Sequence, residues 1–179
     1  MKKLTIYLLC LVCLACKKEE AVTPTVPTSF EAYSPTFTAN GEFPQKYTCD
    51  GASISPALAW KNPPAGTKAY AITMHHIPPT GDKHVYMCVF NIGPSVVEFP
   101  ENSTNIGSWG INTVNGKNTY TPPCSQGPGA KIYMITVYAL SDQPTITLAP
   151  NKITMDVLLD AISTKTLAKS VMSVTYTRP

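Results

Sequence analysis

The stretch FPQKYTCDGASISPALAW, residues 43–60, is the part of this 179-residue chain that says most about its fold. It holds Pro44, Asp50-Gly51 and Pro56, all typical of turns, and it ends in an apolar run at Trp60. Outward from it, short runs of β-branched and aromatic residues alternate with connections rich in Pro, Gly and Asn. Together with 17 prolines in the chain, this pattern predicts a mainly β protein and argues against a helical bundle.

Four segments are the best candidates for strands, because they are rich in β-branched and aromatic residues: 69–76, 85–92, 131–140 and 170–177. Several of them are apolar on both faces, as central strands are. One helix is predicted after Pro150-Asn151, with Asn151 or Thr154 as its cap. The long stretch from Phe99 to Gly129 is irregular, which in a compact domain indicates a functional loop or one held in place by other means.

The first residues resemble a secretory signal, with two lysines before an apolar stretch that ends at Ala15. This stretch is too short to span a bilayer as a helix. Ala15 is the small residue that a lipoprotein signal peptidase needs before a lipidated cysteine, so we expect cleavage after residue 15 and a lipid on Cys16. The metal-like spacing of Cys10, Cys13 and Cys16 is then a coincidence of an apolar segment.

Residues 16–32 are expected to be a lipid anchor followed by a Thr/Pro-rich tether, and residues 33–179 a single domain. The segment 17–20, KKEE, resembles the signal that follows the cysteine of surface-exported lipoproteins, although a solvated charge run would look the same. We therefore expect an outer-membrane or cell-surface lipoprotein, with the periplasmic face as the other orientation. The anchor is the only membrane contact expected.

The net charge expected after signal cleavage excludes nucleic acid as a partner. Residues 1–15 contain two lysines and no acidic residue, so their removal leaves 12 basic against 11 acidic residues. A net charge near +1 without clustered basic residues gives no footprint for nucleic acid, which binds by displacement of counterions.

Five segments carry a resemblance to a known family: FPQKYTCDGASISPALAW (43–60), PPAGTKAYAITM (63–74), PTG (79–81), YTPPC (120–124) and YALSD (138–142). Together they resemble the phosphatidylethanolamine-binding protein family, in its bacterial Raf-kinase-inhibitor-like branch, over nearly all of residues 37–179. The resemblance implies two packed antiparallel sheets with a peripheral C-terminal helix. It also implies a small anion-binding pocket at one end.

The pocket residues of the family are replaced in this chain. The family's Asp-Pro-Asp-Ala-Pro segment falls on residues 75–79, HHIPP, so neither aspartate is present. Its strand histidine falls on Tyr86 and its His-Arg pair on Lys131-Ile132. We expect His75, Tyr86 and Lys131 to bind a small anion, phosphate-like or carboxylate, because they offer donors and positive charge. The alternative is a vestigial pocket that Ile77 fills.

No metal site, cofactor or catalytic residue is expected. His75 and His76 are neighbours on one strand and point to opposite faces, so they cannot readily share an ion, and His84 could reach only one of them. Ser53 and Ser55 lie in DGASISP without a Gly-x-Ser-x-Gly elbow. These patterns predict a protein that is not an enzyme.

The resemblance brings the loops of Cys49 and Cys124 to the pocket end, which implies a disulfide between them in an oxidising export compartment. Cys88 lies within an apolar strand and is expected to be a buried free thiol.

The function expected from the sequence is non-enzymatic recognition of a small anion or a protein partner at the modified pocket. The alternative is a protease-inhibitor-like or structural surface protein with a vestigial pocket. Kinase inhibition, known for eukaryotic relatives, makes little sense outside the cytoplasm.

Overall fold

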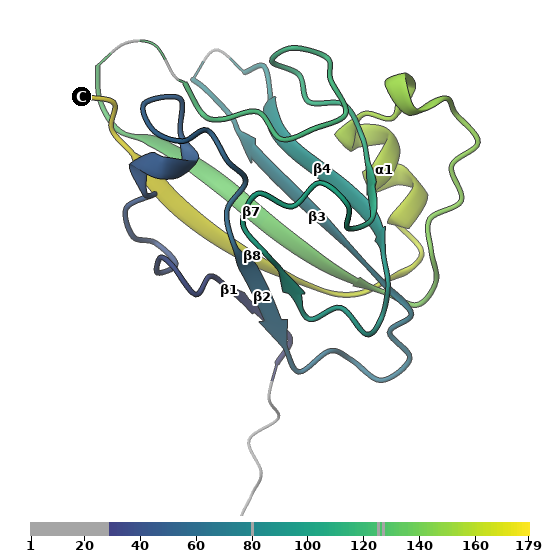
Figure 1. Ribbon diagram of the computed structural model, residues 1–179. Helices are drawn as coiled ribbons and strands as arrows, with labels where there is room; N and C mark the ends of the chain where they lie inside the picture. Colours follow the sequence, from purple (N-terminus) through teal and green to yellow (C-terminus); the bar gives the residue numbers. More distant parts are fainter. Residues whose placement is uncertain (1–28, 80, 125, 127) are drawn as a thin grey trace, which may run out of the picture.

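The structure, a computed structural model, describes residues 29–79, 81–124, 126 and 128–179 (Figure 1). The predicted signal segment 1–15, the predicted lipidation site Cys16 and most of the tether lie outside the described residues. The elements in chain order are β1 (Glu31–Tyr33), η1 (Gln45–Tyr47), β2 (Leu58–Lys61), β3 (Ala69–His76), β4 (His84–Ile92), β5 (Glu98–Phe99), β6 (Ser108–Trp109), β7 (Lys131–Leu140), η2 (Pro150–Lys152), α1 (Met155–Ile162) and β8 (Thr166–Tyr176).

These strands form two antiparallel sheets, as the family resemblance implied. The smaller sheet has the order β1-β2-β5, and the larger has the order β6-β4-β3-β7-β8. All four predicted strands belong to the larger sheet. The last of them, β8, starts four residues before the predicted segment because it pairs with β7 along that strand's whole length, from Lys131↔Tyr176 to Leu140↔Thr166.

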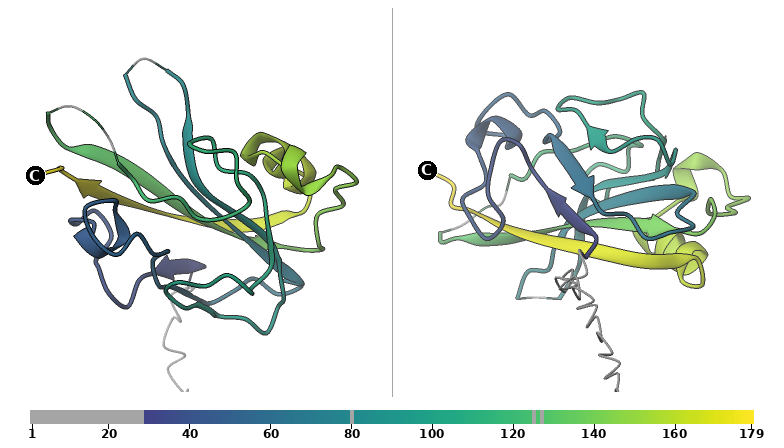
Figure 2. Two further views of the ribbon diagram at one scale, coloured as in Figure 1. Left: turned by 45° about the horizontal axis from the view of Figure 1, so that its top comes forward. Right: turned by 90° about the horizontal axis from the view of Figure 1, so that it is seen from below.

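The larger sheet is covered on both faces, which explains why its strands are apolar on both sides (Figure 2). In β3, the large side chains Tyr70, Ile72 and Met74 pack in the cluster that the smaller sheet covers. Ala69 and Ala71 point the other way and pack in the cluster that α1 covers. The large residues of β3 therefore fill the space between the two sheets, whereas its small residues allow α1 to pack close to the other face.

Helix α1 begins at Met155, where the side chain of Thr154 caps it by accepting a hydrogen bond from the amide of Val157 at 3.2 Å. Of the two predicted caps, Thr154 is the one used, and Asn151 lies in the 3-10 turn η2 instead. Met155, Leu158 and Ile162 form the buried face and hold the helix on β4. Burial of each such side chain contributes roughly 1.5–3 kcal/mol.

Strand β1 begins at Glu31, two residues before the predicted domain boundary at Tyr33. Glu31 and Ala32 pair with Lys61 and Trp60 in the smaller sheet, and Ala32 is buried. Figure 1 draws the start of the described chain below β1 and β2 and the β3–β4 connection at the top of the view. No helix in the described ranges is both long and apolar enough to cross a bilayer.

Candidate functional site

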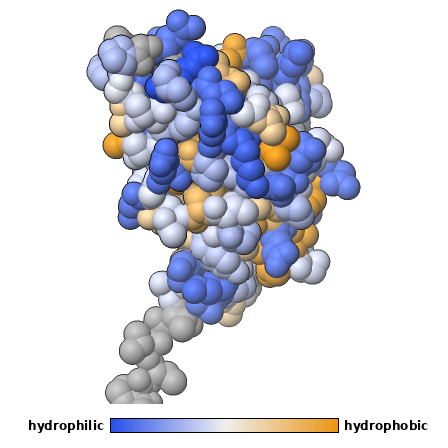
Figure 3. Space-filling view, turned by 60° about the vertical axis from the view of Figure 1, so that its left-hand side comes forward, coloured by the Kyte–Doolittle hydropathy of each residue, from blue (hydrophilic) through white to orange (hydrophobic). Residues whose placement is uncertain are grey.

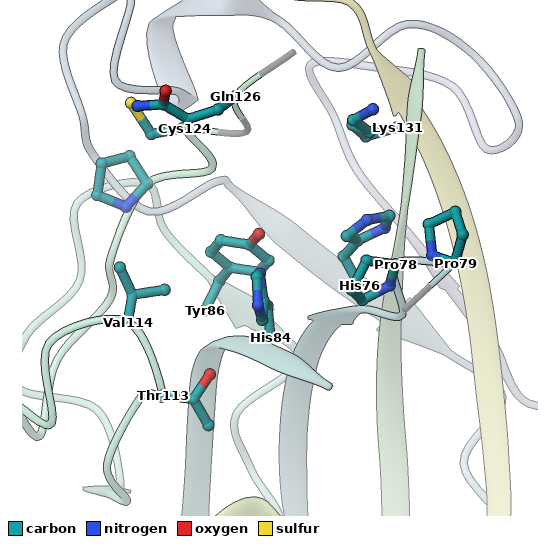
Figure 4. Close-up of a pocket in the computed structure, with 11 residues that line it drawn as sticks. His76, Pro78, Pro79, His84, Tyr86, Thr113, Val114, Cys124, Gln126 and Lys131 are labelled. Atoms are coloured by element: carbon teal, nitrogen blue, oxygen red, sulfur yellow. The ribbon is translucent and has the colours of Figure 1, made fainter. Parts of the chain in front are cut away.

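A cavity of about 620 Å³ opens at the end of the larger sheet, where β3 ends and where β4 and β7 begin (Figure 4). The described residues that line it come from these strand ends and from two loops of the long irregular stretch: His76, Pro78, Pro79, His84, Tyr86, Thr113, Val114, Pro122, Cys124, Gln126 and Lys131. This is the end at which the sequence predicted a pocket.

Of the three predicted site residues, Tyr86 and Lys131 line the cavity and His75 does not. The placement of His75 was wrong because strand residues alternate between faces. In β3 the even-numbered side chains point toward the smaller sheet and the cavity, so His76 takes the place expected of His75. The alternation of Tyr70 and Ile72 with Ala69 and Ala71 separates the two faces of β3, but both are apolar, so it does not say which one faces the cavity.

His76 is held rigidly in the cavity wall. Its side chain is buried, its ring lies 5.4 Å from that of Tyr133, and its Nδ1 atom is 2.8 Å from the carbonyl oxygen of Ile132. A carbonyl oxygen only accepts hydrogen bonds, so Nδ1 carries the proton and donates it. The Nε2 atom of neutral His76 is therefore a lone-pair site, and it becomes a donor only when the ring is protonated.

Tyr86 reaches the cavity through an irregularity in β4. Met74 pairs with Met87 and His75 pairs with Val85, so the ladder passes over Tyr86 as the extra residue of a bulge. As a result Tyr86 and Met87, although consecutive, both pack in the cluster under the smaller sheet. Bulges redirect side chains in this way near functional sites.

Lys131 is the first residue of β7 and supplies a cation to the cavity. Its Nζ atom donates to the carbonyl oxygen of Pro128 at 3.3 Å, and the side chain is half-buried. Its strand register explains its direction, because the odd-numbered residues Tyr133 and Ile135 of β7 point to the same face.

The opposite wall is a loop that Asn112 organises. The buried side-chain amide of Asn112 donates to Asn115 Oδ1 and to the carbonyl oxygens of Lys117 and Thr119, and its oxygen accepts from the amides of Val114 and Asn115. These bonds provide hydrogen-bond partners for backbone groups of a segment that has no regular secondary structure. They hold Thr113 and Val114 at the cavity, a role that sequence reasoning missed although the stretch is rich in asparagine.

A disulfide joins Cys49 to Cys124, the pairing that the resemblance implied. The amide of Cys49 also donates to the carbonyl oxygen of Pro123 at 3.1 Å. The loop that carries Pro122, Cys124 and Gln126 to the cavity is therefore tied to the segment before β2. Cys88 is a free thiol, as predicted, and burial raises its pKa to about 12.

The cavity is open and its described lining has a positive bias. None of the described lining residues carries a carboxylate, whereas Lys131 carries an ammonium and two lining residues are histidines. Ile77, which would fill a vestigial pocket, has 58% of its surface exposed and is not among the described lining residues. The alternative of a pocket filled by Ile77 is therefore wrong.

His75 lies on the other face of β3, near the start of α1. Its pKa is lowered mainly by burial and also by the positive charge of Lys83, while Asp156 opposes this effect. Lys83 and Asp156 form an ion pair at 2.7 Å that joins the β3–β4 connection to the helix. The Nδ1 atom of His75 has no hydrogen-bond partner among the described residues, so this histidine belongs to the helix–sheet contact.

Comparison with known proteins gives a consistent result for the whole domain. A family model described as phosphatidylethanolamine-binding protein matches residues 33–177. A UPF0098 protein of Methanothermobacter thermautotrophicus is 31% identical over 127 residues, which cover 68% of this chain and 82% of that protein. A Mycobacterium tuberculosis protein with the name "Putative lipoprotein LppC" is 29% identical over 108 residues, or 60% of this chain and 53% of that protein.

Other curated relatives are longer than the region matched. The chain spans 61% of a UPF0098 protein of Mycobacterium tuberculosis, to which it is 29% identical over 126 residues. Two crystal structures share the fold. The protein CT736 of Chlamydia trachomatis has a TM-score of 0.76 at 25% identity, over 84% of this chain and 99% of that one. YbcL of E. coli has a TM-score of 0.75 at 21% identity, over 85% and 100%.

The two antiparallel sheets, the helix and the end cavity thus occur in a chain whose matched region extends from β1 to the end of β8. On this evidence the chain belongs to the phosphatidylethanolamine-binding protein family.

Proposed function

We propose that this chain is a non-enzymatic binding protein whose cavity recognises a small anion, either phosphate-like or carboxylate. The observation that carries the proposal is the composition of the described lining, which brings together Lys131, two histidines and the phenol of Tyr86 without a carboxylate. Such a set offers positive charge and hydrogen-bond donors to an anion.

Each of these residues has a distinct role in the proposed recognition. The ammonium of Lys131 supplies permanent charge. His76 contributes a donor from Nε2 only when its ring is protonated, because Nδ1 is already committed to Ile132. Without a carboxylate among the described lining residues, neither histidine has an acidic partner in the cavity of the kind that orients a catalytic base. These groups therefore support ligand binding without catalysis.

The form of the surface favours a small ligand over a protein partner. The cavity is open, and the large exposed apolar side chains of the described residues include one aromatic, Tyr33, which lies in β1 away from the cavity. On the face seen in Figure 3, polar residues separate the apolar ones. A protein-binding site would be expected to show a larger continuous apolar patch.

We further propose that Cys16 is lipidated and that the domain stands on an outer-membrane or cell-surface anchor. The signal-like start and Ala15-Cys16 support this location, and the relative named "Putative lipoprotein LppC" is consistent with it.

Calorimetric titration with inorganic phosphate and with acetate tests the proposal. Lys131→Ala should weaken binding by about tenfold or more, because a hydrogen bond to a charged group contributes about 1.5–3 kcal/mol. His76→Gln should weaken binding as well, because it removes one of the two imidazoles that line the cavity. His75→Gln is the matched control and should leave affinity unchanged.

The proposal is overturned if Lys131→Ala and His76→Gln bind phosphate and acetate as tightly as the control His75→Gln. That result, or an absence of binding by the wild type, would favour the alternative of a protease-inhibitor-like or structural surface protein.

A further inference from the structure

His76 and His84 lie opposite each other at the end of the β3–β4 ladder. They are direct Cα partners at the last position of that ladder, and both line the cavity (Figure 4). Residues directly opposite each other in an antiparallel pair project to the same side, with Cβ atoms about 4.5–5.5 Å apart. Two imidazoles at that spacing can direct one nitrogen each at a shared point. The sequence analysis allowed His84 to reach one of the two neighbouring histidines, and the register shows that this one is His76.

The tautomer of His76 is the one that a metal requires. Donation from Nδ1 to the Ile132 carbonyl leaves a lone pair on Nε2, and burial holds the ring in that orientation. Metal-binding histidines characteristically donate their other ring nitrogen to a backbone carbonyl or a carboxylate in this manner. His84 is exposed at the cavity rim, so its side chain has the freedom to complete the pair.

We propose that His76 and His84 together bind a divalent transition-metal ion, with Cu²⁺ preferred over Ni²⁺ and Zn²⁺. The preference follows from the general order of stability of nitrogen complexes of these ions. Water, or an anion that enters the cavity, takes the remaining coordination positions. This inference goes beyond the proposed anion site but shares its cavity and His76, and the two histidines bind the metal in their neutral form.

The site is an open one with two side-chain ligands. Among the described residues there is no group of three or more His, Cys, Asp or Glu side chains able to hold a metal. The ammonium of Lys131 in the same cavity opposes a cation. Both facts predict weaker binding than at a structural zinc site, which has four protein ligands.

The metal ion and the anion carry opposite charges, so experiments can distinguish metal binding from anion binding. The ammonium of Lys131 repels a metal cation, whereas it attracts an anion. Lys131→Ala should weaken phosphate binding and leave Cu²⁺ binding equal or stronger, because it removes a positive charge.

The chain contains three histidines, so three single variants test every histidine that could bind the metal. Tag-free domain is titrated with Cu²⁺, and the nitrogen coupling in its electron paramagnetic resonance spectrum is recorded. His76→Gln and His84→Gln should each weaken Cu²⁺ binding at least tenfold and reduce the coupled imidazole nitrogens from two to one. His75→Gln, the matched control, should change affinity less than twofold.

Three results would each overturn the metal site. The first is wild-type Cu²⁺ binding in both His76→Gln and His84→Gln. The second is an equal loss in His75→Gln. The third is no saturable binding by the wild type at millimolar Cu²⁺. Phosphate titration of the same variants without metal reports on the anion site alone, so failure of one site is not mistaken for failure of the other.

Discussion

Removal of the Cys49–Cys124 disulfide should cause a large and calculable loss of stability. The bond closes a segment with a sequence separation of 75 residues. In the chain-entropy model, closure of a loop of this length destabilises the unfolded state by about 4 kcal/mol. For a domain of this size, such a change lowers the melting temperature by roughly 10 °C. The double variant Cys49→Ala/Cys124→Ala should therefore unfold at clearly lower urea concentration than the wild type.

Tryptophan fluorescence during urea unfolding measures this effect, because Trp60 is buried in the main core cluster and Trp109 packs against it. A reducing agent should bring the wild type to the level of the double variant and leave the double variant unchanged. Cys88→Ala is the control, since it removes the free thiol and should keep the full response to reductant. A difference below about 1 kcal/mol between wild type and double variant would refute the loop-entropy argument, as would a reductant response lost in Cys88→Ala.

Three other changes have defined outcomes. Cys16→Ser should release the protein from the membrane fraction; retention at wild-type level would contradict lipidation. Asn112→Ala should lower the free energy of unfolding, measured in urea, by about 3 kcal/mol. The change leaves several amides and carbonyl oxygens of the loop without the hydrogen-bond partner that the Asn112 side chain provides. The pKa of His75 is lowered in the folded state, so the unfolded state takes up its proton first and stability falls as pH drops below the ordinary imidazole range. His75→Gln should reduce the loss of stability between pH 7 and pH 5, and an unchanged pH profile would contradict this.

Much of the fold could be predicted from local pattern. The turn-rich segment around Asp50-Gly51, the apolar runs and the capped helix are signals contained in a few neighbouring residues, and each corresponds to an element of the structure. The family resemblance placed the cavity at the correct end and identified Tyr86 and Lys131 as residues that line it. Local chemistry was sufficient for these conclusions because turns, strands and caps depend on short-range preferences.

The sequence by itself thus determined the four long strands of the larger sheet and the helix, and the family resemblance indicated the end of the domain where a cavity forms. Only the tertiary structure decided which side of β3 faces that cavity. Both faces of the strand are apolar, so the choice between His75 and His76 depends on which layer packs on each face. The pairing of His76 with His84 and the redirection of Tyr86 depend on the β3–β4 register and its bulge. Register is set by contacts between distant residues, and a shift of one residue moves every side chain to the opposite face.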